Sequence, residues 1–257
     1  MNQFRICTAG TFVLLASALP VLGQPAPAKP PQAVYKIAMN QDSFFGFYPT
    51  VSGAFRVNDK VDATAYGIFW TTPSFGTGGG GGLWTEAGAG VNLKAYDGKW
   101  TFTPQLGILN GKLLSNGSFP MAFEGIVPNI TSNVNPSRFE GEFYMGRYTA
   151  LRTGRVAGAG GNLVNAANQN NFLHWWINGG VKLNSVVSAG LHYESLGSNP
   201  SGNLPSGSVY RWLGPYVQGT MGGFALRFSA GPDVQDRPRN DGTGSFYKLT
   251  ASYTFSN

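Results

Sequence analysis

The sequence predicts an all-β fold: a transmembrane antiparallel β-barrel of twelve strands, with ten strands as the alternative. Three observations predict it. Charged residues make up only 12% of the 257 residues, about half the share of a soluble domain, while aromatic residues reach 14% and glycines number 37. Segments of roughly ten residues, the length of a tilted membrane strand, alternate polar and apolar positions. The connections between these segments are alternately very short and long.

The alternation is clearest in four segments: Trp100–Ile108, Leu173–Leu183, Val187–Glu194 and Phe224–Ala230. Successive side chains of a strand point to opposite faces, so each segment has one apolar and one polar face. A soluble β-sandwich would show the same period. The length of the segments, the near absence of helical periodicity and the pattern of connections together favour a barrel in lipid.

The connections fall into two length classes, as in barrels that have short turns on one side of a membrane and longer loops on the other. The short ones are rich in Asn, Asp and Gly, which tight turns require. They are 58–60, 96–98, 133–137, 184–185 and 221–223, and the long ones are 72–82, 152–171, 197–207 and 232–243. The glycine run Gly78–Gly82 lacks the Lys-Ser/Thr of a phosphate loop, so we expect it to be a surface loop.

These connections divide the chain into strands. We expect them at Val34–Met39, Phe44–Val57, Val61–Thr71, Leu83–Ala95, Lys99–Leu113, Met121–Ser132, Arg138–Leu151, Phe172–Leu183, Val186–Leu196, Val209–Thr220, Phe224–Gly231 and Ser245–Phe255. An even count is the rule for bacterial single-chain barrels, and it places both chain ends on the side of the short turns. The first and the sixth segment have the weakest pattern, and without both the count is ten.

The N-terminus has the pattern of a secretory signal peptide. Arg5 precedes an apolar run from Thr11 to Leu19, and small or modest residues follow at Val21-Leu22-Gly23. The run is shorter than the roughly 20 residues that span a bilayer. We therefore expect a signal peptide over 1–23, a Pro/Ala-rich periplasmic linker over 24–33 and the barrel over 34–257. Cys7, the only cysteine, lies in the signal, so the exported chain is expected to have no disulfide.

The last strand carries a family resemblance. Tyr247, Leu249, Ala251, Tyr253 and Phe255 share one face, and polar residues share the other. This strand resembles the C-terminal β-signal of Gram-negative outer-membrane proteins, although that signal usually ends on the aromatic residue and here two residues follow. The resemblance implies that the barrel-assembly machinery recognises Tyr247, Leu249, Tyr253 and Phe255. It also implies a place in the outer membrane, with its lipid and lipopolysaccharide as partners.

The tryptophans suggest aromatic girdles at the two membrane interfaces. Trp70 and Trp84 stand at the loop ends of adjacent expected strands, and Trp100 stands near a short turn. Trp rings are favoured at both interfaces of a membrane, so we expect these three on the lipid-facing wall.

Ionisable residues on the polar faces are candidates for lining the lumen. They are Arg56, Asp62, Glu86, Lys94, Glu140, Glu142, His174, Lys182, His192, Glu194, Arg227 and Lys248. One interpretation is a polar pore lining that sets solute preference. The other is structural, because buried charges usually pair with one another.

Catalysis has two weaker candidates. Glu140 and Glu142 lie on one face with Arg138, but a cross-strand ion network is the commoner use of such charges. The segment Leu191–Ser195 partly resembles the His-x-Ser motif of some outer-membrane lipid hydrolases. However, a side chain three positions from His192 points to the opposite face of a strand, so the nucleophile is missing where the motif needs it.

Three function classes follow: a narrow porin-like channel for small solutes, a structural or surface-interaction barrel with a plugged lumen, and an envelope-lipid hydrolase using His192. The channel leads and the hydrolase comes last. We assign no catalytic residue. With two histidines and no zinc-binding spacing we expect neither metal nor cofactor. Nucleic acid is not expected despite the net charge of +6, because the Lys and Arg are scattered. The oligomeric state is left open.

Overall fold

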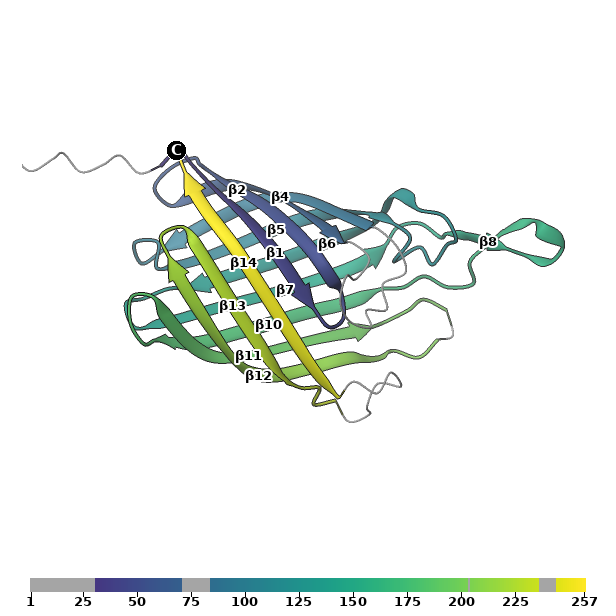
Figure 1. The fold of residues 1–257 in the computed structure, drawn as a ribbon. Coiled ribbons are helices and arrows are strands. Elements are labelled where there is room, and N and C mark those ends of the chain that lie inside the picture. The colour runs from purple at the N-terminus through teal and green to yellow at the C-terminus, as the bar shows by residue number, and fades with distance from the viewer. Residues whose placement is uncertain (1–30, 71–83, 203, 236–243) are drawn as a thin grey trace, which may run out of the picture. The chain divides into compact units, whose positions relative to one another are not determined.

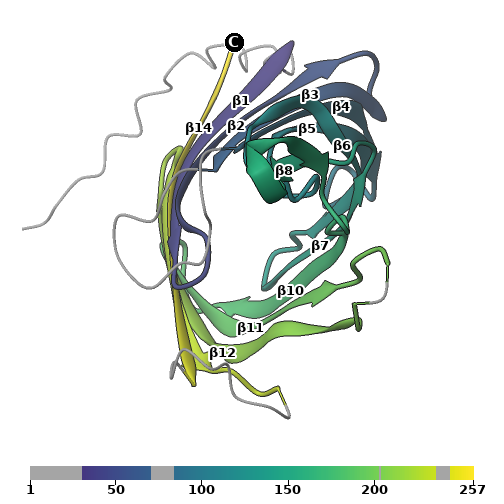
Figure 2. The ribbon, with the colours of Figure 1, turned by 90° about the vertical axis from the view of Figure 1, so that its right-hand side faces the viewer.

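A computed structural model describes residues 31–70, 84–202, 204–235 and 244–257. The expected signal peptide, most of the linker and the glycine run Gly78–Gly82 lie outside these residues. Within them the chain forms a closed antiparallel barrel of twelve strands, in which each strand pairs with its neighbours in sequence and β1 pairs with β14 (Figures 1 and 2). The predicted fold class and the strand count of twelve are confirmed.

The barrel strands lie close to their predicted positions. They are β1 (Ala33–Asp42), β2 (Gly46–Arg56), β3 (Val61–Trp70), β4 (Trp84–Ala95), β5 (Trp100–Gly111), β6 (Met121–Val134), β7 (Phe139–Ala150), β10 (Phe172–Lys182), β11 (Val187–Ser198), β12 (Gly207–Met221), β13 (Phe224–Pro232) and β14 (Ser245–Ser256). The two weakest predicted segments are therefore real strands, β1 and β6. No helix in the described part of the chain is long and apolar enough to cross a membrane.

The two ends of the barrel differ. The short-turn end carries five tight connections and the end of β14. The long-loop end carries the short turn 43–45 between β1 and β2 and the long connections, including residues 151–171. That connection contains a small hairpin, β8 (Arg155–Ala157) and β9 (Leu163–Asn165), around the 3-10 turn η1 (Ala159–Gly161), and it projects beyond the barrel (Figure 1). Its strands were not predicted, because three residues are too few to show a period.

The outer wall of the barrel is apolar, as the alternation predicted. Leu106, Ile177, Leu191 and Phe228 are all exposed on it, while their neighbours in sequence point inward. Near the short-turn end the ring of Tyr35 stacks on that of Phe255 with 5.3 Å between centroids. This wall has the character that lipid contact requires.

The buried core lies inside the barrel, toward the long-loop end. Trp70 and Trp84, expected on the lipid-facing wall, are instead only 4% and 6% exposed and belong to an internal cluster with Tyr48, Leu109 and Tyr148. Their interfacial placement was therefore wrong. The reason is the parity of the strands: Trp70 lies an even number of positions from Asp62, and Trp84 lies two positions from Glu86, so all four share the inner face.

Candidate functional site

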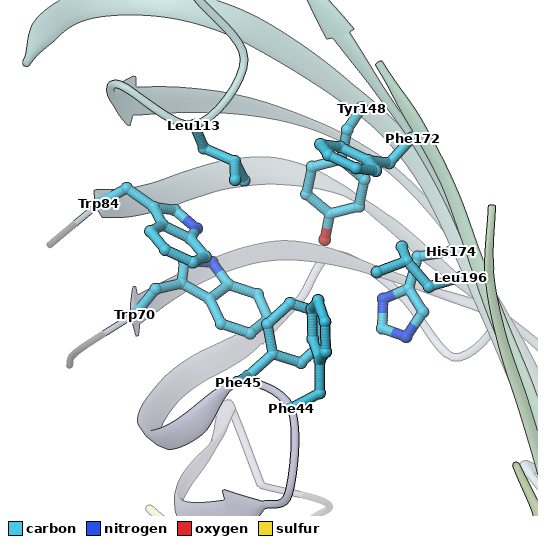
Figure 3. A pocket seen from close by; sticks show the side chains of 9 residues that line it. All are labelled: Phe44, Phe45, Trp70, Trp84, Leu113, Tyr148, Phe172, His174 and Leu196. Atoms are coloured by element: carbon cyan, nitrogen blue, oxygen red, sulfur yellow. The ribbon is translucent and has the colours of Figure 1, made fainter. Parts of the chain in front are cut away.

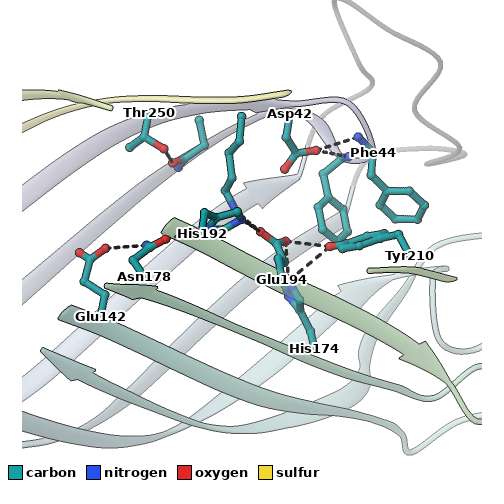
Figure 4. A network of polar contacts seen from close by, with 12 residues as sticks. Asp42, Phe44, Glu142, His174, Asn178, His192, Glu194, Tyr210 and Thr250 are labelled. Atoms are coloured by element: carbon teal, nitrogen blue, oxygen red, sulfur yellow. Dashed lines mark hydrogen bonds and ion pairs between the residues drawn. The ribbon is translucent and has the colours of Figure 1, made fainter. Parts of the chain in front are cut away.

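Glu194 is the centre of a buried polar network inside the barrel (Figure 4). Its carboxylate accepts a hydrogen bond from the Tyr210 hydroxyl at 2.8 Å and pairs with the Lys248 ammonium at 2.6 Å. Nε2 of His174 lies 2.8 Å from Glu194 Oε1, and Nε2 of His192 lies 3.0 Å from Oε2. The carboxylate of Glu194 on β11 thus contacts side chains of β10, β11, β12 and β14. These partners compensate its buried negative charge.

The network continues toward the short-turn end. Nδ1 of His192 lies 2.7 Å from Oδ1 of Asn178, and the Asn178 amide donates to Glu142 at 3.0 Å. The same Glu142 oxygen pairs with Arg227, which also donates to Gln218 at 2.8 Å. Because β7 and β13 are separated by three other strands in the barrel order, the pair of Glu142 and Arg227 reaches across the lumen.

Glu140 has partners of its own. It accepts hydrogen bonds from the hydroxyls of Ser188 and Tyr216, each at 2.7 Å. Arg227 also lies over the Tyr216 ring, 4.9 Å from its centroid. Glu140 and Glu142 therefore share a face, as expected, and each carries a separate set of structural contacts.

The remaining predicted lumen residues stand apart from this network. Asp62 pairs with Lys94 at 2.6 Å, and Glu86 accepts from the Tyr66 hydroxyl at 2.6 Å. Arg56 pairs with Asp59 in a short turn, and Lys182 donates to the Pro136 carbonyl at the short-turn end. The structure thus gathers seven of the predicted twelve around Glu194 and Glu142 and leaves five elsewhere. The gathered residues are Glu140, Glu142, His174, His192, Glu194, Arg227 and Lys248.

At the long-loop end a carboxylate folds a short turn into the lumen. Asp42, the last residue of β1, is fully buried, and its Oδ1 accepts from the backbone N–H groups of Phe44 at 2.9 Å and Phe45 at 2.6 Å. A side-chain oxygen that satisfies two backbone donors of a turn holds it in one conformation. The two phenyl rings are therefore held among the aromatic side chains of the barrel mouth (Figure 3).

Phe45 touches opposite walls of the barrel. Its ring centroid lies 4.6 Å from that of Trp70 on β3. It also lies 5.7 Å from the ring of His174 on β10 and 6.5 Å from that of Tyr210 on β12. In the barrel order β3 and β10 are nearly opposite. One side chain thus bridges the lumen at its long-loop end.

A second buried carboxylate holds the connection between β5 and β6. Glu124 accepts hydrogen bonds from the backbone N–H groups of Leu113 and Leu114 and from the N–H and hydroxyl of Ser115. It is fully buried, as is Leu114. This connection is therefore packed into the mouth of the barrel.

Sequence reasoning missed several of these residues. Tyr210, Asn178, Asp42 and Glu124 were not among the candidates for the lumen. The alternation along β10 could have identified Asn178, because it lies four positions from both His174 and Lys182 and therefore shares their inner face. Tyr210 lies eight positions from Gln218 on β12 and so shares its inner face.

The fold defines a class: a closed twelve-strand barrel like those of bacterial outer-membrane proteins. The chain belongs to the family DUF6733, a family of unknown function, whose model matches residues 2–255. No curated protein matches the sequence.

Solved structures agree in fold. One similar structure has a TM-score of 0.51 at 12% identity, covering 87% of this chain and 83% of that chain. It is described as "Unveiling the Mechanism Behind the in-meso Crystallization of Membrane Proteins". The NanC porin has a TM-score of 0.49 at 10% identity, covering 85% and 98%. The outer membrane channel DcaP of Acinetobacter baumannii has 0.42 at 12% identity, covering 82% and 63%. At such identities the likeness shows the fold alone.

Proposed function

We propose that this chain is an outer-membrane barrel whose lumen is closed near the long-loop end by its own side chains, and that it acts in surface interaction. The observation that carries the proposal is the position of Phe45, whose ring touches Trp70 on one wall and His174 on the other. Aromatic rings packed between opposite walls exclude water from that cross-section, and ions do not pass a dry apolar layer.

The place in the membrane is supported by the apolar outer wall and by the resemblance of the last strand to the C-terminal β-signal of outer-membrane proteins. The role at the surface is supported by the hairpin of β8 and β9, which projects from the long-loop end and exposes Leu163 and Val164 (Figure 1). Apolar side chains on a projecting hairpin are unusual unless another surface covers them.

A narrow porin-like channel is the second candidate. It is favoured by the charged groups nearer the short-turn end, where the side chains of Arg227 and Glu142 are 19% and 26% exposed. Water therefore reaches this part of the lumen. Lipid hydrolysis is not proposed, since His192 is buried against Glu194 and Asn178, and Ser195 lies on the other face of β11.

Conductance in planar lipid bilayers separates the two candidates. If the lumen is closed, the wild-type protein should give no resolvable steps in the ionic current. The double variant Phe44→Ala/Phe45→Ala, which removes both rings from the mouth, should give current steps. Phe119→Ala, at an exposed phenylalanine between β5 and β6, is the matched control and should stay silent. Steady conductance by the wild-type protein would overturn the closed lumen in favour of the channel.

A further inference from the structure

Two arginines face outward from the wall of the barrel near its long-loop end. Arg147 lies three positions before the end of β7, and Arg211 lies four positions after the start of β12. Each stands between two residues that are buried inside the barrel, so each points away from the lumen. The other charged side chains on the twelve described barrel strands face the lumen or, in Glu124, are buried in the mouth. The outward wall of these strands therefore has charge near one end only, and that charge is positive.

The strands between the two arginines complete a patch that we call the arginine face: Arg147, Trp175, Tyr193, Ser195 and Arg211. In the barrel order β10 and β11 lie between β7 and β12, so three strand spacings, about 14 Å, separate the strands that carry the arginines (Figure 2). Ser195 of β11 pairs with Arg211 on one side and with Trp175 of β10 on the other. The ring centroids of Trp175 and Tyr193 are 4.9 Å apart. Aromatic and small side chains thus lie between two cations, on a wall that is otherwise apolar.

The rest of the long-loop end has the same sign of charge. Arg152 and Arg155 are exposed in the connection after β7. In the described part of the chain, Asp233 is the one acid at this end that is not buried, and it accepts hydrogen bonds from two backbone N–H groups. The segments 71–83 and 236–243 add no net charge to the sequence. A partner that binds this end is therefore anionic, because opposite charges attract.

The position of the arginine face restricts the kind of anion. The face belongs to the wall that contacts lipid, close to the level where the strands end, so its partner has an apolar part in the membrane and a charged part at the interface. A guanidinium group matches the geometry of a phosphate, to which it can donate two parallel hydrogen bonds. Two such groups on one face fit a lipid headgroup that carries two phosphates.

We propose that the arginine face binds a phosphorylated glycolipid of the outer leaflet, with one phosphate on Arg147, one on Arg211 and the acyl chains along the apolar wall. Lipid A, the anchor of lipopolysaccharide, has this chemistry. The inference rests on the proposed place of the barrel in the outer membrane, and it is independent of whether the lumen conducts.

Native mass spectrometry of the protein in detergent micelles tests the ligand class. The probes are lipid A with two phosphates, lipid A with one phosphate, and zwitterionic phosphatidylethanolamine. Each phosphate that meets an arginine should strengthen binding about fivefold, so the three probes should bind in that order. Glucosamine 1-phosphate, which lacks acyl chains, should not displace lipid A.

The double variant Arg147→Gln/Arg211→Gln removes both charges and should weaken binding of lipid A with two phosphates about twentyfold. Arg147→Lys/Arg211→Lys keeps the charges and loses the paired hydrogen bonds, so its affinity should lie between those of the Gln variant and the wild type. The matched control is Arg138→Gln, at an exposed arginine of the short-turn end, and it should bind as the wild type does. Heat-dependent gel migration establishes that each variant is folded.

Several results would overturn the inference. Equal binding of lipid A and phosphatidylethanolamine would remove the role of the phosphates. An equal loss in Arg138→Gln would show a general effect of charge, and displacement by glucosamine 1-phosphate would reassign the face to a soluble sugar phosphate. Cell fractionation tests the proposed place of the barrel separately. If lipid A binds without these preferences to a protein that fractionates with the outer membrane, the inference fails and that place stands.

Discussion

The ammonium of Lys248 on β14 lies 2.6 Å from the carboxylate of Glu194 on β11, although β12 and β13 separate the two strands. The contact joins the closing strand of the barrel to a strand on a different part of its wall. It is one of four contacts that converge on Glu194, and the carboxylate is fully buried.

Replacing this carboxylate should destabilise the barrel. In Glu194→Gln the Lys248 ammonium keeps its charge and loses its buried counter-ion, so we expect the free energy of unfolding to fall by about 3–5 kcal/mol. Urea unfolding of the refolded protein in lipid vesicles measures it. Asp97→Asn, in an exposed turn with φ of 56°, is the control and should leave the stability within about 0.5 kcal/mol. Equal effects of the two variants would contradict a structural role for Glu194.

A close approach of two glycines should make the loops of the mouth sensitive to a single methyl group. A Cβ on Gly154 would lie 2.4 Å from the Gly117 Cα and N atoms, closer than atoms can pack. Gly154→Ala should therefore separate the two connections and cost about 1–3 kcal/mol. Amide hydrogen exchange should rise at Ser118, whose N–H donates to the Arg155 carbonyl. In Gly179→Ala, where a Cβ meets open space, exchange should stay as in the wild type.

The apolar outer wall predicts that the cost of a charge depends on depth. Leu191, in the middle of β11, is 61% exposed, and Leu191→Arg should cost about 2–4 kcal/mol if this position faces the centre of a bilayer. Val186→Arg, at the short-turn end beside β11, should cost about 0–1 kcal/mol. Folding free energies in lipid vesicles compare the two. A similar cost at both positions would argue against a lipid-facing wall.

The two ends of the barrel should differ in access from outside the cell. Asn162→Cys lies in the hairpin at the long-loop end, and Asp97→Cys lies in a turn at the short-turn end. In a Cys7→Ser background, a membrane-impermeant maleimide applied to whole cells should label position 162 and spare position 97. The reverse pattern would invert the topology.

The N-terminus should be processed during export. The pattern around Gly23 predicts a mature chain that begins near Gln24. N-terminal sequencing of protein extracted from outer membranes tests this expectation. An intact Met1 would show that the segment is retained.

The strands were predictable because their signal is local: alternation along each segment and the residue types of each turn can be read without knowing the neighbours. The inner position of Trp70 was also within reach, since Asp62 on the same strand has the same parity. Contacts between distant strands were not. Whether Arg227 reaches Glu142 depends on the width of the barrel and on the stagger of its strands, which no single segment encodes. The inward turn at Phe44 and Phe45 depends in the same way on the space that the opposite wall leaves.

The seam between β1 and β14 has a consequence for how the molecule assembles. Asn40 and Thr250, which hydrogen-bond across it, are 210 positions apart in the chain. The entropy of bringing two such distant segments together is lost before their contacts form, and this slows folding. Until then the sheet has two open edges, each able to pair with the wrong strand. β14 is therefore the strand that closes the barrel, and a chain shortened by β14 would lose closure as a whole instead of one strand in twelve.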